Sequence, residues 1–136
     1  MCKRREEGPE KVILVDTDVL IWVLRGREDI VRRFEEALEE KEGFVFITPV
    51  QEAEIFAGAR KGEESLINSF LSSLKNIPID SESGSRAGEY LAKYGKSHGT
   101  TLADAFVAAV ASVNGLKLWT LNRKHFPMLK REDFFS

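Results

Sequence analysis

The sequence predicts an α/β fold, a single domain in which a central, mostly parallel sheet is sandwiched between α-helices. Short apolar segments typical of buried strands alternate along the chain with segments of helical spacing. No linker, repeat or low-complexity segment divides the 136 residues, which is the usual length of one domain. In this fold class ligands bind beyond the carboxyl ends of the strands, so polar residues at those ends are candidates for a site.

The N-terminal part of the chain contains two strand-like and four helix-like segments. The first segment, KVILV, is an apolar, β-branched run that suits a strand buried on both faces. Glycines follow several helical segments, as is common at helix C-termini, and Pro49 suits a first helical turn. The expected strands are residues 11–15 and 44–47, and the expected helices are residues 17–25, 28–42, 49–58 and 63–74.

The C-terminal part contains two further helices and two further strands. Asp80 and Ser81 are suitable caps for the first of these helices. The second helix is almost entirely apolar, so we expect it to be buried, and Gly115 ends it. The expected helices are residues 81–97 and 101–114, and the expected strands are residues 76–79 and 116–121.

The composition is that of a soluble globular protein, with 43% apolar and 31% charged residues. No apolar run approaches the roughly 20 residues needed to span a membrane. Residues 1–10 are too polar for a signal peptide, so we expect a flexible leader ahead of a domain formed by residues 11–136. The single cysteine, Cys2, has no internal disulfide partner, which favours a reducing, cytoplasmic setting.

The net charge of −2 argues against a protein that binds nucleic acid through a broad basic surface. It does not exclude a nuclease, because a site built from carboxylates lowers the net charge by itself. Local basic clusters are available for contacts with RNA, although each is also explained as solvated surface charge. These clusters are Arg60–Lys61, Lys93–Lys96–His98 and Arg123–Lys124–His125.

Four acidic or amide side chains stand in distinctive contexts: Asp16 in VDTDVLI, Glu54 in AEIFAG, Asp104 in LADAFVAAVA and Asn122 in TLNRKHF. Asp16 directly follows the first expected strand, and Asn122 follows the last. If the fold gathers these side chains, they form a cluster of hard oxygen ligands suited to a divalent cation. Thr120 is either an ordinary strand residue or a hydroxyl that faces the same site.

Three of these positions also have a purely structural interpretation. Asp16 is a good N-cap for the helix that follows it, and Asp18 is either a second ligand or a favourable charge in the first turn. Asp104 lies three residues after Thr101, a spacing similar to that of a capping box. Asn122 is a common type of turn residue.

Glu54 is one of two acidic candidates on its expected helix. Its neighbours at helical spacing include Ala57 and Gly58, so we expect the Glu54 carboxylate to be partly buried against small residues. A partly buried carboxylate is costly unless it is paired or metal-bound. Glu52 projects to nearly the opposite side of the helix, and the spacing alone leaves both residues open as ligands.

Together these segments resemble the PIN domain family and, within it, the VapC-type toxin ribonucleases. The resemblance extends from about residue 12 to residue 126 and rests on VDTDVLIWVLRG, ITPVQEAEIFAGAR, IPIDSESGSRAGEYLAKYGKSHG and TLADAFVAAVASVNGLKLWTLNRKHF, in that order. It implies a PIN domain over residues 11–136 with an acidic site that binds Mg²⁺ or Mn²⁺. Asp16, Glu54 and Asp104 match the three acidic metal ligands. Asn122 falls where many members carry a fourth acid and others an Asn.

The resemblance also implies an activity and partners. The activity is hydrolysis of RNA phosphodiester bonds by a metal-dependent endoribonuclease. The partners are an RNA substrate, a VapB-type antitoxin protein and a second copy of the chain in a homodimer, with no membrane association. Around the metal ligands, the candidate supporting residues are Thr17, Asp18 and Thr120, and the candidate RNA contacts are Arg60, Lys61, Arg123 and Lys124.

One feature of the sequence favours a protein partner independently of the resemblance. Residues 19–24, VLIWVL, are apolar all round their expected helix. Because the core of the domain needs only one or two faces of a helix, part of this run, especially Trp22, is available to contact another protein. A helix fully enclosed in its own domain explains the pattern equally well.

Two other functions are compatible with the sequence. A degenerate PIN fold could act as a non-catalytic interaction or RNA-binding module, although all three central acids are present. The segment Asp16-Thr17-Asp18 after a strand also resembles the start of a haloacid-dehalogenase-type phosphatase, in which the first Asp is a nucleophile. That resemblance is weaker, because Leu20 stands where Thr or Val is expected and no late acidic pair occurs near Asn122.

Overall fold

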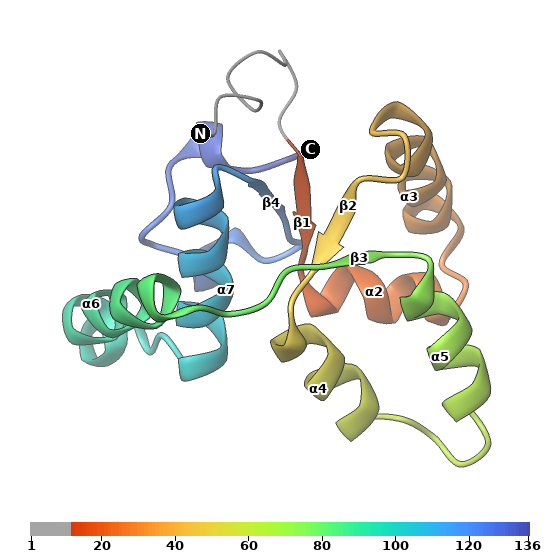
Figure 1. Ribbon diagram of the computed structural model, residues 1–136, viewed down its shortest axis with the longest axis horizontal. Helices are drawn as coiled ribbons and strands as arrows, with labels where there is room; N and C mark the ends of the chain where they lie inside the picture. The colour runs from red at the N-terminus through yellow and green to blue at the C-terminus, as the bar shows by residue number, and fades with distance from the viewer. Residues whose placement is uncertain (1–11) are drawn as a thin grey trace.

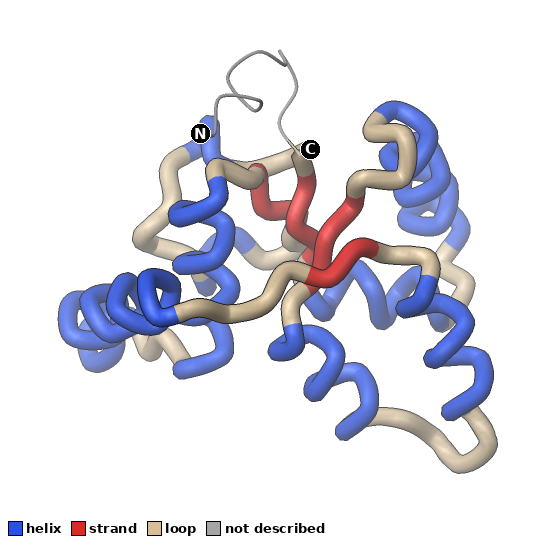
Figure 2. The backbone as a smooth tube through the Cα atoms, viewed as in Figure 1, coloured by secondary structure: helices blue, strands red, loops and turns tan. Residues whose placement is uncertain are grey.

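The computed structural model describes residues 12–136, and the expected leader at residues 1–10 lies outside the described residues. Its centre is a four-stranded sheet in the order β3-β2-β1-β4, and all three pairs of neighbouring strands are parallel. Figure 2 shows these short strands side by side at the centre of the molecule, with helices around them. The strands are β1 (Ile13–Val15), β2 (Val45–Ile47), β3 (Lys75–Asn76) and β4 (Lys117–Trp119).

Helices cover both faces of the sheet, which confirms the predicted α/β sandwich. In Figure 1, α6 and α7 lie on one side of the sheet, and α2, α3 and α5 lie on the other. The helix α4 follows the carboxyl end of β2. The α-helices are α2 (Thr17–Leu24), α3 (Glu28–Glu40), α4 (Pro49–Ala57), α5 (Glu64–Ser72), α6 (Ser81–His98) and α7 (Leu102–Asn114), and two 3₁₀ helices, η1 (Arg123–His125) and η2 (Arg131–Asp133), follow β4.

The strands contribute side chains alternately to two hydrophobic cores, one on each face of the sheet. Ile13 and Val15 of β1 belong to the core formed with α2, α3 and α5, whereas Leu14 belongs to the core formed with α7. Burial on both faces explains why β1 is continuously apolar in sequence rather than alternating. The predicted burial of the apolar helix α7 is confirmed, since Ala105 and residues 107–111 are all buried.

All four predicted strands are longer than the strands in the structure, and the third and the last differ at their carboxyl ends. The third was expected at residues 76–79, but β3 ends at Asn76. The Ile77 N–H still donates to the Ile47 carbonyl oxygen (2.8 Å), and Pro78, which has no N–H, stops the ladder. The last strand ends at Trp119 rather than Leu121, because the residues after Trp119 bond to side chains that follow β1 instead.

The segment after β4 contains an extension of the sheet that the sequence did not reveal. Phe134 forms a parallel bridge with Leu118, and the Phe135 N–H donates to the Leu118 carbonyl oxygen (2.9 Å). The edge of β4 is therefore partly covered. Within residues 12–136, no helix has the length and apolar character required to cross a membrane.

Candidate functional site

The candidate site lies at the carboxyl ends of β1 and β4, which the parallel pairing of these strands brings together. The Asp16 N–H donates to the carbonyl oxygen of Trp119, the last residue of β4 (2.9 Å). One residue further along, the Thr120 hydroxyl donates to Asp16 Oδ2 (2.8 Å). Two residues that are 104 positions apart in sequence are thus in direct contact, so Thr120 is the hydroxyl that faces the site, one of the two alternatives left open by the sequence.

Asp16 has the capping role that the sequence left open, and its geometry is compatible with a further role in the site. It is the N-cap of α2, and its Oδ1 accepts a hydrogen bond from the Thr17 N–H (2.9 Å), so the capping interpretation is confirmed. Its second oxygen faces Thr120 on the other side of the site. Capping therefore does not compete with a role in the site, because each role uses a different oxygen.

Asp18 holds the segment that follows β4 in place through hydrogen bonds. Its Oδ1 accepts from the Val19 N–H (2.7 Å), and its Oδ2 accepts from the Leu121 N–H (3.0 Å) and lies 3.3 Å from the Thr120 hydroxyl. The Thr120 hydroxyl also accepts from the Asn122 N–H (3.1 Å), which holds Asn122 at the same end of the sheet. These bonds give Asp18 and Thr120 the supporting position that the sequence analysis suggested.

Asp104 enters the site from the first turn of α7. Thr101 is the N-cap of this helix, and its hydroxyl accepts from the Asp104 N–H (3.1 Å). The Asp104 side chain itself faces His125, whose Nδ1 lies 3.9 Å from Asp104 Oδ2. On its other side, His125 Nε2 lies 3.1 Å from the Asn122 side-chain nitrogen. His125 therefore links two of the four candidates.

Glu54 reaches the site through Thr17, whose hydroxyl donates to Glu54 Oε1. The expectation that the Glu54 carboxylate is partly buried is wrong: Glu54 is exposed, as are Ala57 and Gly58. The buried side of α4 carries Gln51 and Ile55 instead, because these residues face the sheet. A tertiary contact with Thr17, rather than burial on its own helix, brings Glu54 close to Asp16.

Two residues at the site were not identified from the sequence. Gln51 is completely buried, its Nε2 donates to the Val15 carbonyl oxygen (2.9 Å), and its Oε1 accepts from the Thr48 N–H (3.1 Å). These bonds join the start of α4 to the end of β1 and so set the position of Glu54. The second residue, His125, could have been recognised as a site residue from its spacing, since it lies three residues after Asn122 on a short helical turn.

The electrostatics of the site show an excess of negative charge around Asp16. The pKa of Asp16 is raised to about 7, first by burial and then by the neighbouring carboxylates of Asp18 and Asp104, whereas the hydrogen bonds from Thr120 and Thr17 lower it. The pKa of Asp18 is also raised, mainly by burial. A bound cation would relieve this repulsion.

The residues present fit a hard divalent cation by their chemistry. All three candidate ligands are carboxylates, the donors that Mg²⁺ and Mn²⁺ prefer. Within the part of the chain that the structure describes, however, no three His, Cys, Asp or Glu side chains lie together as a metal-binding group. The Thr17 hydroxyl holds the Glu54 carboxylate, so a three-carboxylate site requires this exposed side chain to turn toward the two aspartates.

The candidate RNA contacts differ in their availability. The guanidinium of Arg123 lies over the Phe134 ring (4.7 Å to the centroid) and donates to the Ser136 hydroxyl (3.1 Å), so the C-terminal segment already engages it. Arg60 and Lys61 lie in the exposed loop between α4 and α5, and Lys124 lies on η1. For these three residues, RNA contact stays a prediction.

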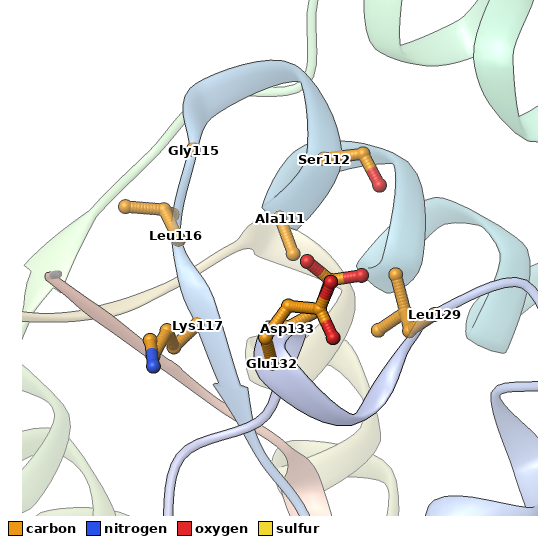
Figure 3. Close-up of a pocket in the computed structure, with 8 residues that line it drawn as sticks. All are labelled: Ala111, Ser112, Gly115, Leu116, Lys117, Leu129, Glu132 and Asp133. Atoms are coloured by element: carbon orange, nitrogen blue, oxygen red, sulfur yellow. The ribbon is translucent and has the colours of Figure 1, made fainter.

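Of two hollows lined by described residues, one adjoins the candidate site. A groove of about 440 Å³ between α2, α4 and α5 is lined partly by Glu54 and Ile21. The hollow in Figure 3, of about 380 Å³, lies at the amino end of β4, away from the candidate metal ligands at the carboxyl ends of the strands. It is lined by Ala111, Ser112, Gly115, Leu116, Lys117, Leu129, Glu132 and Asp133.

A parallel α/β domain that presents carboxylates at the ends of its central strands defines the class of this protein. The family model described as the PIN domain matches residues 13–131, which is most of the chain. The chain belongs to the PIN domain family. Membership in this family confirms the resemblance stated from the sequence, and it makes the haloacid-dehalogenase alternative wrong.

Relatives of known name and structure are similar over nearly the whole chain. Ribonuclease VapC10 of Mycobacterium tuberculosis is 37% identical over 121 residues, which cover 88% of this chain and 90% of the relative. Ribonuclease VapC1 of Methanocaldococcus jannaschii is 32% identical over 132 residues, which cover 94% and 88% respectively. A toxin-antitoxin complex from Klebsiella pneumoniae contains a chain that matches with a TM-score of 0.71 and 26% identity, over 91% of this chain and 96% of that one.

Proposed function

We propose that this protein is an endoribonuclease of VapC toxin type, which hydrolyses RNA phosphodiester bonds with Mg²⁺ or Mn²⁺ held at the carboxyl ends of the strands. The observation that carries the proposal is the position of Asp16, a partly buried carboxylate whose pKa is raised to about 7 beside two further aspartates. Two relatives of the chain named as ribonucleases support the same activity.

In this proposal Asp16, Glu54 and Asp104 hold the cation, which supplies an activated water and neutralises charge on the phosphate. The protein's part is to position these ligands. Thr120 and the Thr17 amide orient Asp16, and the Thr17 hydroxyl holds Glu54, which would turn toward the aspartates when the cation binds. Asn122 adds an amide instead of a fourth carboxylate, so the site carries less negative charge and is less suited to a tightly bound second cation.

Metal binding should stabilise the folded protein, and this effect distinguishes the two acidic candidates on α4. Free Mn²⁺ at 100 times its Kd should add about 2.7 kcal/mol to the free energy of unfolding, because the folded state alone assembles the site. Differential scanning calorimetry should show a higher Tm for the wild type with Mn²⁺.

Glu54→Gln should reduce this Mn²⁺-induced rise in Tm, whereas Glu52→Gln should preserve it. The two variants make the same chemical change two residues apart on one helix, so each controls for the other. An unchanged Tm of the wild type in Mn²⁺ would contradict the assembled site. A loss of the rise in Glu52→Gln alone would transfer the ligand role to Glu52.

We also propose that a VapB-type antitoxin and a second copy of the chain bind this protein. The structure leaves large apolar side chains exposed on the helices that border the groove beside Glu54. Trp22 on α2 is 42% exposed, and Leu66 on α5 is 55% exposed. Partner contacts would remove this apolar surface from water. The match to a chain in a toxin-antitoxin complex supports the antitoxin as one partner.

The dimer is tested by light scattering on the purified chain. We expect twice the 15.4 kDa mass of one chain at micromolar concentration. A mass of one chain under these conditions would refute the dimer and leave the ribonuclease proposal untouched, because the candidate ligands all come from one chain.

A further inference from the structure

The C-terminal part of α6 carries a basic and aromatic surface that the proposed site does not use. It consists of Lys93, Tyr94, Lys96 and His98, and we call it the α6 patch. The rings of Tyr94 and His98, one helical turn apart, meet edge to face at 5.3 Å between centroids. The Lys93 ammonium lies 5.5 Å from the centre of the Tyr94 ring. The patch thus combines cations with aromatic rings in one place.

The cations of the patch are available to an external partner. Neither Lys93 nor Lys96 forms an ion pair within residues 12–136, and both are exposed. Glu89, the acid one turn before Lys93, is paired with Arg86 instead (3.5 Å). A local excess of positive charge therefore stands on a protein whose net charge is −2.

Stabilisation of the helix end explains only part of this patch. Cations in the last turn of a helix interact favourably with its dipole, which accounts for Lys96 and His98. Lys93 and Tyr94 lie about one turn earlier, where this effect is weak. His98 is also held in place, because its Nδ1 lies 2.7 Å from the Ser97 hydroxyl.

The α6 patch lies near the candidate active site and is fixed relative to it. Helix α6 ends at His98, and α7, which carries Asp104 in its first turn, begins at Leu102. Asp104 lies six positions after His98, so their Cα atoms cannot be more than about 20 Å apart. The helices are packed together through Ala87, Ala105 and Ala109. Leu102, which is 60% exposed, adds apolar surface between them.

These features match the way proteins bind single-stranded nucleic acid. Unpaired bases stack on aromatic side chains, and lysines contact the phosphates between them. A base-paired duplex cannot offer its base faces to Tyr94 or His98. The combination of rings and unpaired lysines therefore favours single-stranded RNA over a duplex, and over an acidic protein that would need only the charges.

We propose that the α6 patch binds a single-stranded segment of the RNA substrate a few nucleotides from the bond that is cut, with a base on Tyr94 and phosphates against Lys93 and Lys96. This inference rests on the proposed ribonuclease function and deepens it, since it names the form of RNA that the protein selects. The patch contributes to binding and not to the chemical step.

The test measures RNA affinity and cleavage for matched variants of the full chain. Fluorescence anisotropy would follow a short, unstructured RNA of mixed sequence and the duplex formed with its complement, using protein that also carries Asp16→Asn to prevent cleavage. The double variant Lys93→Ala/Lys96→Ala is compared with Lys117→Ala/Lys130→Ala, which removes the same charge elsewhere. Lys117 begins β4, at the opposite end of the sheet.

The patch variant should bind the single strand about tenfold more weakly, with a salt dependence reduced by roughly 0.7 per lost phosphate contact. The control double variant should stay within about twofold of its parent. Tyr94→Leu should also lose about tenfold, whereas Tyr94→Phe, which keeps the ring, should not. In cleavage assays with Mn²⁺ and Asp16 intact, the patch variants should raise KM and leave kcat nearly unchanged.

Each result has a distinct meaning. If the wild type cleaves RNA but the patch variants match the control in affinity and KM, the inference is wrong and the proposed function stands. If Tyr94→Leu binds as tightly as Tyr94→Phe, no base stacks there and the inference is also wrong. If the wild type neither binds nor cleaves RNA, the proposed function itself fails. The Tm of each variant identifies any loss caused by unfolding.

Discussion

Replacing Asp16 or Asp104 with Asn should reduce metal-dependent RNA cleavage by at least about 100-fold. Residues that merely orient metal ligands already cost 10- to 100-fold when they are changed, so the loss of a ligand should cost at least as much. The substitution keeps the size of the side chain but removes the charge that attracts the cation. Cleavage of a labelled RNA by purified protein in Mn²⁺ or Mg²⁺ measures the effect.

Both variants should also abolish growth inhibition when the protein is expressed in cells, if cleavage is the cause of toxicity. Asp29→Asn is a suitable control, because Asp29 is an exposed carboxylate on α3 that pairs with Arg27. Toxicity that persists unchanged in Asp16→Asn would refute the catalytic interpretation. It would favour the alternative, a PIN fold that acts as a non-catalytic interaction or RNA-binding module.

The stability of the metal-free protein should fall between about pH 4 and pH 7 because of Asp16. The pKa of this carboxyl is about 7 in the folded state, against 3.8 as its ordinary value. In this pH window the folded protein keeps a proton that the unfolded chain has lost, so raising the pH favours unfolding. The contribution is complete below about pH 4 and has disappeared above about pH 7.

The loss is at most on the order of 4 kcal/mol, since one pKa unit corresponds to about 1.4 kcal/mol. Urea unfolding of the wild type and Asp16→Asn, measured in a chelator across this range, isolates the effect. The lowered pKa values of Asp29 and Asp80 make the free energy of unfolding rise with pH instead, but they do so equally in the wild type and in Asp16→Asn. Parallel stability curves for the two proteins would show that the pKa of Asp16 is not raised.

The order of helices and strands was predictable because it depends on local patterns. β1 and β2 are largely buried and therefore stand out as short apolar runs, whereas β3 is a short exposed Lys-Asn pair; each helix has its own spacing and end signals. Residues that directly follow strands were also predictable as site residues. Since the strands are parallel, Asp16 and Thr120 had to meet at the same edge of the sheet once β1 and β4 were neighbours.

The details of the site depend on packing between distant segments, which the local pattern does not contain. Nothing within α4 indicates that Gln51 bonds to the Val15 carbonyl oxygen, or that the exposed Glu54 reaches Thr17. The position of His125 next to Asp104 depends on how η1 folds back toward α7. For the same reason Arg123 appeared available from the sequence, although the C-terminal segment engages it.

The pairing of the first and last strands of the sheet also determines when the site can form during protein synthesis. Thr120 and the residues after it emerge from the ribosome after nearly all of the chain, yet they complete the surroundings of Asp16 near its beginning. A nascent chain whose β4 is still inside the ribosome lacks this half of the site. Under the proposed function, we therefore expect an unfinished copy of the protein not to cleave RNA near the ribosome that is making it.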